Sequence, residues 1–131
     1  MKALALLFAV LLIAGCGSQP AAPAATKAET PTAVDVSFAK DIQPILSQSC
    51  MPCHAGGKDA KGNYDLTGYA GTASNGSDAL PNVIPGNVDS SILYLRLSGA
   101  VPPLMPKARP ALDATQLSTI QKWINQGAKN N

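Results

Sequence analysis

Apolar side chains recur at helical spacing between residues 38 and 48. Ser37 stands in front of them as a candidate N-cap, and Pro44 is the one residue that does not suit a helix interior. This pattern predicts a helix over residues 38–48 that is kinked, or begins late, at the proline. Its apolar positions are Phe38, Ile42, Ile45 and Leu46.

A second apolar run predicts a short helix from Ser90 to Leu97. Asp89 precedes it as a candidate N-cap, and Gly99 follows it as a stop signal. Leu93 lies on the apolar side of this helix together with Leu97. We therefore expect this side to face either a bound group or the core.

The last predicted helix has the clearest local signals. Asp113 and Gln116 have the spacing of a capping box, Leu112 is placed to pack on Leu117, and Gly127 follows as a stop signal. The apolar side of this helix must pack against another part of the domain. That side consists of Leu117, Ile120, Trp123 and Ile124.

Between these helices, residues 56–87 are rich in Gly, Asn, Asp and Ser and have only short apolar patches. The composition predicts mostly loop. Long loops in a small domain are usually functional or wrap a ligand. The three helices and this loop together predict a mostly α-helical domain over residues 34–131.

The N-terminus has the organisation of a secretory signal over residues 1–15. Lys2 is followed by an apolar run that is too short to span a bilayer, which needs ~20 apolar residues. The residues Ile13-Ala14-Gly15-Cys16 resemble a bacterial lipobox, and this resemblance implies cleavage before Cys16 and lipidation of its thiol. The protein would then be a membrane-anchored lipoprotein, because more than one acyl chain gives stable attachment.

Two features refine this placement. Gly17, after the cysteine, favours outer-membrane attachment facing the periplasm in a Gram-negative cell, whereas a Gram-positive cell would hold the domain outside its single membrane. Residues 17–33 are Ala, Pro, Thr and Ser with few charges, a composition that does not order on its own. With Cys16, they are expected to form a flexible tether that lets the domain swing between partners.

Charge adds little to this picture. The chain has 10 basic and 8 acidic residues and a formal net charge of +2. Such a balance argues against a nucleic-acid partner. A domain of this length buries only about two thirds of its unfolded surface, so a large apolar cofactor would help to complete the core.

The run Cys50-Met51-Pro52-Cys53-His54 supplies the candidate chemistry. C-x-x-C-H is the spacing that attaches a c-type haem through two thioether bonds, with the histidine as proximal iron ligand. The motif predicts one covalent haem c held by Cys50, Cys53 and His54. In bacteria this attachment takes place outside the cytoplasmic membrane, in agreement with the export signal.

Three other interpretations of the motif remain open but are less favoured. A structural zinc site needs four ligands, and Cys16 is assigned elsewhere. A thioredoxin-like pair is expected near a βαβ pattern, and no hydrophobic strand precedes Cys50. A disulfide between Cys50 and Cys53 is possible in an exported protein but leaves His54 without a role.

The distal iron ligand follows by elimination. His54 is the only histidine, Met1 is removed with the signal, and Met51 lies inside the attachment loop. Met105 remains, in the proline-rich segment Pro102-Pro103-Leu104-Met105-Pro106, where fixed φ angles reduce the entropy cost of holding a ligand. Met105 could instead fill a gap in the core. We expect it to bind the iron because the haem motif is present and the rival ligands are eliminated. Histidine–methionine ligation raises the reduction potential, which suits an electron carrier.

With these residues in view, the domain resembles single-haem class I cytochromes c of the planctomycete type. The resemblance covers residues 38–128 and rests on the haem motif, on Met105-Pro106, and on Val83-Ile84-Pro85-Gly86 and Trp123-Ile124. It implies a mostly α-helical fold in which the terminal helices cross near Trp123. The glycine-rich insert after the motif departs from the shortest cytochromes.

The predicted function is electron transfer without catalysis, through transient contacts with redox partner proteins. The alternative is a ligand-binding sensor or a component of a redox enzyme, with an open or displaceable sixth iron position. A third possibility is a non-haem structural lipoprotein. Tyr64, Tyr69 and Arg96 are candidates to bind the haem propionates.

Overall fold

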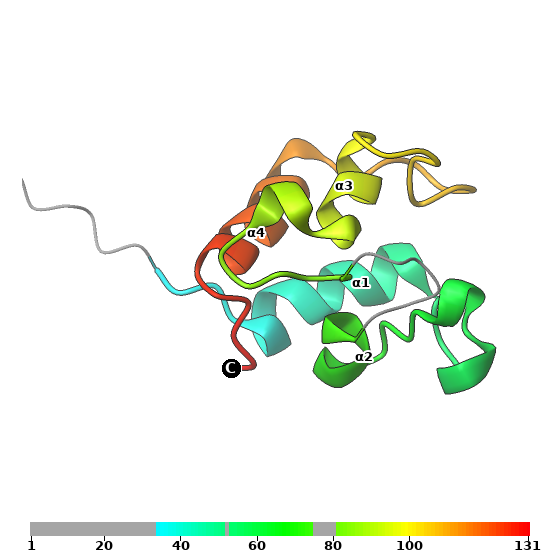
Figure 1. The fold of residues 1–131 in the computed structure, drawn as a ribbon, viewed down its shortest axis with the longest axis horizontal. Coiled ribbons are helices and arrows are strands. Elements are labelled where there is room, and N and C mark those ends of the chain that lie inside the picture. The colour runs from blue at the N-terminus through cyan, green and yellow to red at the C-terminus, as the bar shows by residue number, and fades with distance from the viewer. Residues whose placement is uncertain (1–33, 52, 75–80) are drawn as a thin grey trace, which may run out of the picture. The chain divides into compact units, whose positions relative to one another are not determined.

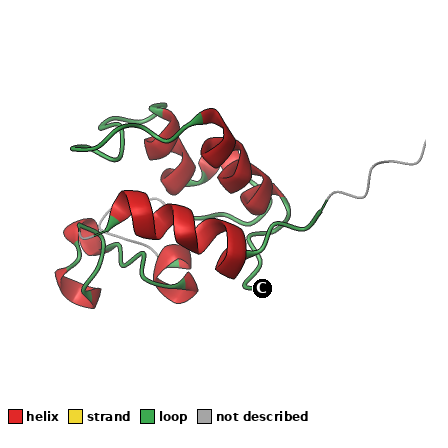
Figure 2. Cartoon of the chain, turned by 180° about the vertical axis from the view of Figure 1, so that it is seen from behind, coloured by secondary structure: helices red, strands yellow, loops and turns green. Residues whose placement is uncertain are grey.

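The computed structural model describes residues 34–131 except Pro52 and residues 75–80. The predicted signal peptide, Cys16 and the tether lie outside these residues. The described part contains helices and loops and no strand, so the predicted fold class is correct (Figures 1 and 2). The helices are η1 Phe38–Ile42, α1 Gln43–Cys50, η2 Gly57–Asp59, η3 Lys61–Asn63, α2 Tyr69–Ala73, η4 Val88–Ser90, α3 Ile92–Ser98 and α4 Ala114–Asn125.

The first predicted helix forms as two joined segments, η1 and α1. Ser37 caps it as expected, because its hydroxyl accepts a hydrogen bond from the Lys40 amide (3.3 Å). η1 is a π-helical turn, and α1 begins at Gln43. Pro44 therefore lies in the first turn of α1, where its missing amide hydrogen leaves no helical bond unmade.

The last helix, α4, also begins as predicted. The Asp113 carboxylate accepts from the Gln116 amide (2.8 Å), and the Gln116 side-chain oxygen accepts from the Asp113 amide (3.1 Å), which completes the capping box. Leu112 is buried and Leu117 packs against the same core. Gly127 follows the helix with a φ of +96°, a conformation that glycine adopts without strain.

Trp123 joins the two ends of the domain in one aromatic cluster. Its side chain is fully buried, and its ring centroid lies 5.5 Å from that of Phe38 and 6.4 Å from that of Tyr69. η1 and α4 therefore contact each other through Phe38 and Trp123. The end of the chain adds to this contact, because Asn131 accepts hydrogen bonds from the Phe38 and Ala39 amides, each 3.1 Å long.

The helix predicted from Ser90 to Leu97 is divided in the structure, and the expected Asp89 cap is wrong. Asn87 caps the 3-10 turn η4 by accepting from the Ser90 amide (3.1 Å), and α3 starts only at Ile92. Ser91 separates them, because its hydroxyl donates to the Asn87 carbonyl (2.7 Å) and accepts from the Ile84 amide (2.8 Å). Gly99 ends α3 as predicted.

The segment predicted as loop also contains a helix that the sequence did not indicate. α2 is held by tertiary contacts around Thr72, whose hydroxyl donates to the Gly68 carbonyl (2.9 Å) and whose carbonyl accepts from the buried Asn82 side chain. The backbone carbonyl of Asn82 accepts a hydrogen bond from the Leu93 amide (3.0 Å). These bonds join α2 to α3 through a single asparagine.

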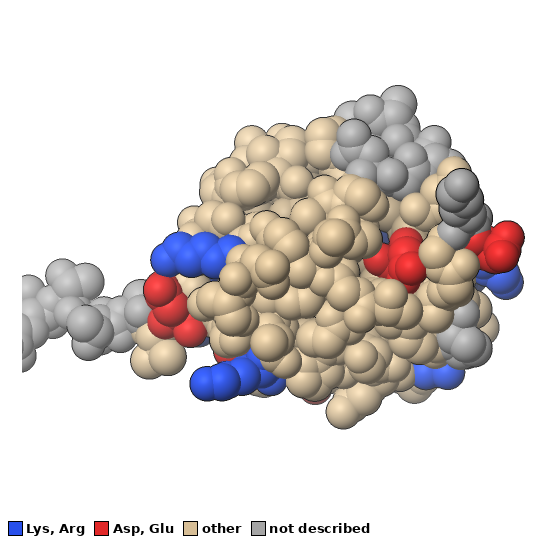
Figure 3. Space-filling model, turned by 90° about the horizontal axis from the view of Figure 1, so that it is seen from below, with Lys and Arg blue, Asp and Glu red and all other residues tan. Residues whose placement is uncertain are grey.

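Figure 3 shows one face of the domain, where most of the surface is uncharged and the charged side chains lie toward its margins. Among the described residues, no helix has the length and hydropathy needed to cross a membrane.

Candidate functional site

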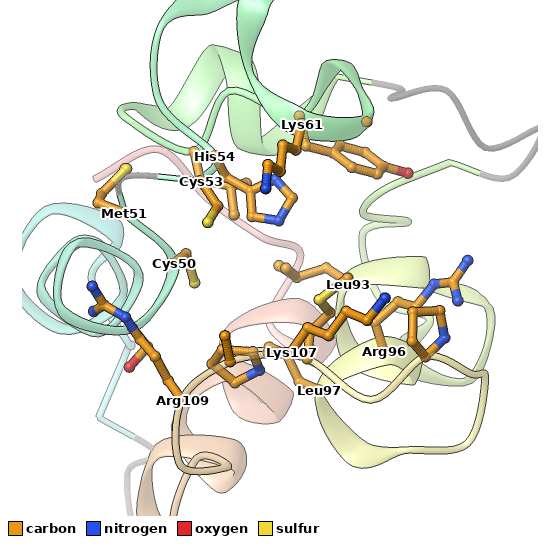
Figure 4. A pocket seen from close by; sticks show the side chains of 18 of the residues that line it. Cys50, Met51, Cys53, His54, Lys61, Leu93, Arg96, Leu97, Lys107 and Arg109 are labelled. Atoms are coloured by element: carbon orange, nitrogen blue, oxygen red, sulfur yellow. The ribbon is translucent and has the colours of Figure 1, made fainter.

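A cavity of about 540 Å³ lies between the end of α1, α3 and the loops that follow each of them (Figure 4). Its volume is in the range of sites that take small molecules and cofactors. The apolar part of its lining is formed by Leu66, Ile92, Leu93, Leu97, Pro103 and Pro106. Cys50, Cys53, His54 and Met105 line the same cavity.

The haem-attachment motif begins at the end of α1, and its cysteine and histidine residues line this cavity. Cys50 is the last residue of α1, and its carbonyl accepts from the His54 amide (3.1 Å). The Cys53 carbonyl accepts from the Lys61 amide (3.0 Å), and the His54 carbonyl accepts from the Leu66 amide (2.7 Å). The motif is therefore fixed by backbone bonds, which leave the cysteine and histidine side chains to line the cavity.

The two thiols of the motif differ in their environment. Cys50 is buried and Cys53 is exposed, and both are free thiols. Burial raises the pKa of Cys50 to about 11, and the positive charge of Arg109 opposes that rise. Within the described residues, no three His, Cys, Asp or Glu side chains gather as a metal site.

Met105 lies on the loop between α3 and α4 and lines the cavity from there. Its side chain is half-buried and packs against the hydrophobic core. Its amide donates to the Arg96 carbonyl (2.9 Å), and the Val101 amide donates to the Leu95 carbonyl (3.1 Å). These two bonds hold the start of the loop against the end of α3, so Met105 lines the same cavity as His54.

Residues 50–109 match the planctomycete cytochrome C family. This part of the chain is a cytochrome c domain. The matched region starts at Cys50 and ends at Arg109, and both of these residues line the cavity. No curated protein and no solved structure matches the chain.

Cytochromes c carry covalently bound haem c, and the residues around the cavity fit this group. The Nδ1 atom of His54 is buried and has no hydrogen-bond partner among the described residues. Buried polar atoms without partners are rare, because each costs roughly 1–3 kcal/mol. An imidazole that no protein group holds through Nδ1, beside two free thiols and an apolar cavity, suits a cofactor that those thiols attach.

The candidate haem cavity of this cytochrome c domain also has basic side chains in its lining, of which the sequence analysis named only Arg96. Lys61, Arg96, Lys107 and Arg109 line it, and none of its described lining residues is acidic. Lys107 and Arg109 follow Met105 closely in the sequence, and this proximity could have indicated them. Lys61 is the first residue of η3, and only the folded chain brings it to the same cavity (Figure 4).

The three candidates for propionate binding are separated by the structure. Tyr64 and Arg96 line the haem cavity, whereas Tyr69 does not. The Tyr69 ring packs edge-on against Phe38 at a centroid distance of 5.3 Å, and its hydroxyl donates to the Ala128 carbonyl (2.9 Å). Tyr69 therefore belongs to the aromatic cluster around Trp123. Trp123 is likewise a core residue that does not line the haem cavity.

Proposed function

We propose that this cytochrome c domain is a one-electron carrier whose single haem c is held by Cys50 and Cys53, with His54 and Met105 as axial ligands. One observation carries the proposal: the residues of the motif and Met105 line one cavity although about 50 positions separate them in the sequence. The sequence has three cysteines and one histidine, which is enough for one such motif.

When bound, haem c supplies an iron that accepts and releases one electron. The residues of the chain hold and tune this group. Cys50 and Cys53 would attach it at the end of α1, and Leu93 and Leu97 would exclude water from its face. A methionine sulfur opposite a histidine raises the reduction potential, which suits transfer to an oxidising partner. Transfer of a single electron needs no acid or base.

The far-red sulfur-to-iron band of the ferric holoprotein tests the ligation. We expect the band in the wild type and its loss in Met105→Ala, which should also lower the reduction potential and allow carbon monoxide to bind the reduced protein. Met51→Ala is the matched control, because Met51 also lines the cavity but lies inside the attachment turn. A wild type that lacks the band and binds carbon monoxide would instead indicate a sensor or an enzyme component.

We further propose that the domain is exported and tethered to a membrane through lipidated Cys16, from which it meets redox partner proteins in transient contacts. The support is the lipobox-like sequence before Cys16, together with an attachment chemistry that takes place outside the cytoplasm. Cys16→Ser should move the haem-stained protein from the membrane fraction to the soluble fraction. Unchanged membrane association would refute the anchor and leave the haem assignment unaffected.

A further inference from the structure

Arg109 connects the methionine loop to the helix that carries Cys50. Its guanidinium Nη1 donates to the backbone carbonyl of Gln48 over 2.6 Å, across 61 positions in the sequence. Gln48 lies in the last turn of α1, two residues before Cys50. Arg109 also lines the haem cavity, and its charge acts on the Cys50 thiol. Figure 4 shows the Arg109 and Cys50 side chains near each other.

The Gln48 carbonyl, at an exposed position, lacks the usual helical donor. In an α-helix it would accept from the amide four positions later, and that residue is Pro52, which has no amide hydrogen. The last turn of α1 contains no basic residue of its own, although a positive charge there would be favoured by the helix dipole. Arg109 supplies both the donor and the charge.

The same bond holds the second end of the loop that contains Met105. At the first end, Met105 and Val101 donate their amides to carbonyls of α3. Arg109 follows Met105 by four residues and reaches α1. The segment between these ties, Met105 to Arg109, lines the cavity continuously. It is thus held to α3 on one side and to the helix preceding the haem motif on the other.

We propose that Arg109 is a positioning residue, which keeps the loop closed so that Met105 stays on the haem iron. This inference rests on the proposed ligation by Met105. Without the Gln48 bond, the loop would open more often, and the iron would be exposed more often to an external ligand. The apparent affinity for such a ligand rises in proportion to the fraction of open protein.

Imidazole binding to the ferric holoprotein measures that fraction. We expect Arg109→Gln to bind imidazole about tenfold more tightly than the wild type, from the size of one charge-assisted hydrogen bond. Lys122→Gln is the matched control, because it removes the same charge from an exposed position on α4 outside the cavity lining. It should bind imidazole as the wild type does.

The decisive comparison repeats Arg109→Gln in a Met105→Ala background. With no methionine to displace, Arg109→Gln should then change imidazole affinity less than about twofold, because its effect acts through Met105. An equal gain in both backgrounds, or no gain with Met105 present, would overturn the role of Arg109. If Met105→Ala itself leaves imidazole affinity at the wild-type value, the proposed ligation fails instead.

Discussion

Gly71 lies against the backbone of Asp65 so closely that a Cβ atom at position 71 would overlap the Asp65 carbonyl. This contact packs α2 against the chain segment that follows the haem motif. It explains why a glycine stands inside a five-residue helix, where it is otherwise unfavourable.

Gly71→Ala should therefore destabilise the domain by about 2 kcal/mol. Helix propensity alone would favour alanine by about 1 kcal/mol, but the overlap with Asp65 outweighs it. Chemical denaturation of the holoprotein measures the change. Gly68→Ala is the control, because a Cβ at that position meets nothing within 4 Å. Equal stabilities of the two variants would contradict the close approach.

Asp65 itself should make stability depend on acid pH. Its carboxylate accepts from the Thr67 hydroxyl (2.6 Å), the Thr67 amide (2.9 Å) and the Gly57 amide (2.9 Å), and these bonds, those of Thr67 foremost, lower its pKa below the ordinary value. The folded state thus releases this proton more readily than the unfolded state. Its contribution is complete above about pH 4, the pKa in the unfolded chain, and is lost as the pH falls through the lower folded value.

Denaturation of Asp65→Asn at several pH values checks the sign. The stability difference from the wild type should be largest near neutrality and shrink in acid. Asp59→Asn, at an exposed position in η2, is the control for removal of one negative charge. A difference between Asp65→Asn and the wild type that grows on acidification would be inconsistent with the three hydrogen bonds.

Tyr69→Phe should separate a structural tyrosine from one beside the haem. Loss of the hydrogen bond to the Ala128 carbonyl should cost about 1 kcal/mol of unfolding free energy and leave the haem spectrum and potential unchanged. Tyr64→Phe, in the cavity lining, is the comparison and should shift the potential. A larger shift in potential for Tyr69→Phe than for Tyr64→Phe would contradict the assignment.

Each cysteine of the motif should contribute one thioether bond to the haem. Single replacement of Cys50 or Cys53 by alanine should leave at most one thioether, which the pyridine haemochrome spectrum distinguishes from two. Cys50→Ala should also lower stability more, since Cys50 is buried in the core and Cys53 is exposed. In the double variant, acid acetone should extract any bound haem; retention of haem would refute thioether attachment.

The parts of the fold that were predictable depend on neighbours in the sequence. The Ser37 cap and the Asp113–Gln116 box are local hydrogen-bond patterns, so the sequence reveals them directly. α2 was missed because distant groups stabilise it, among them Asn82. Asp89 was predicted as the cap because a periodic pattern does not reveal the Ser91 hydroxyl bonds that interrupt the helix.

The same distinction applies to the site. Spacing within the motif predicted Cys50, Cys53 and His54 as the residues that hold the haem, and elimination among the methionines predicted Met105; all four line the cavity. Lys61 and Arg109 were missed because they come from separate parts of the chain, and only folding places them at one cavity. The overall charge is close to balance and therefore does not indicate that basic side chains gather at the cavity.

The entry of the chain into the domain lies at the end opposite the methionine loop (Figures 1 and 2). There the Val36 amide donates to the Gln126 side chain (2.8 Å), and Lys129 pairs with Asp35 (3.1 Å), so the first described residues are fixed to the end of α4. A support attached ahead of Val34 would thus hold the domain by the end that lies away from the methionine loop. Coupled to an electrode in this way, the protein would present its redox centre to the solution.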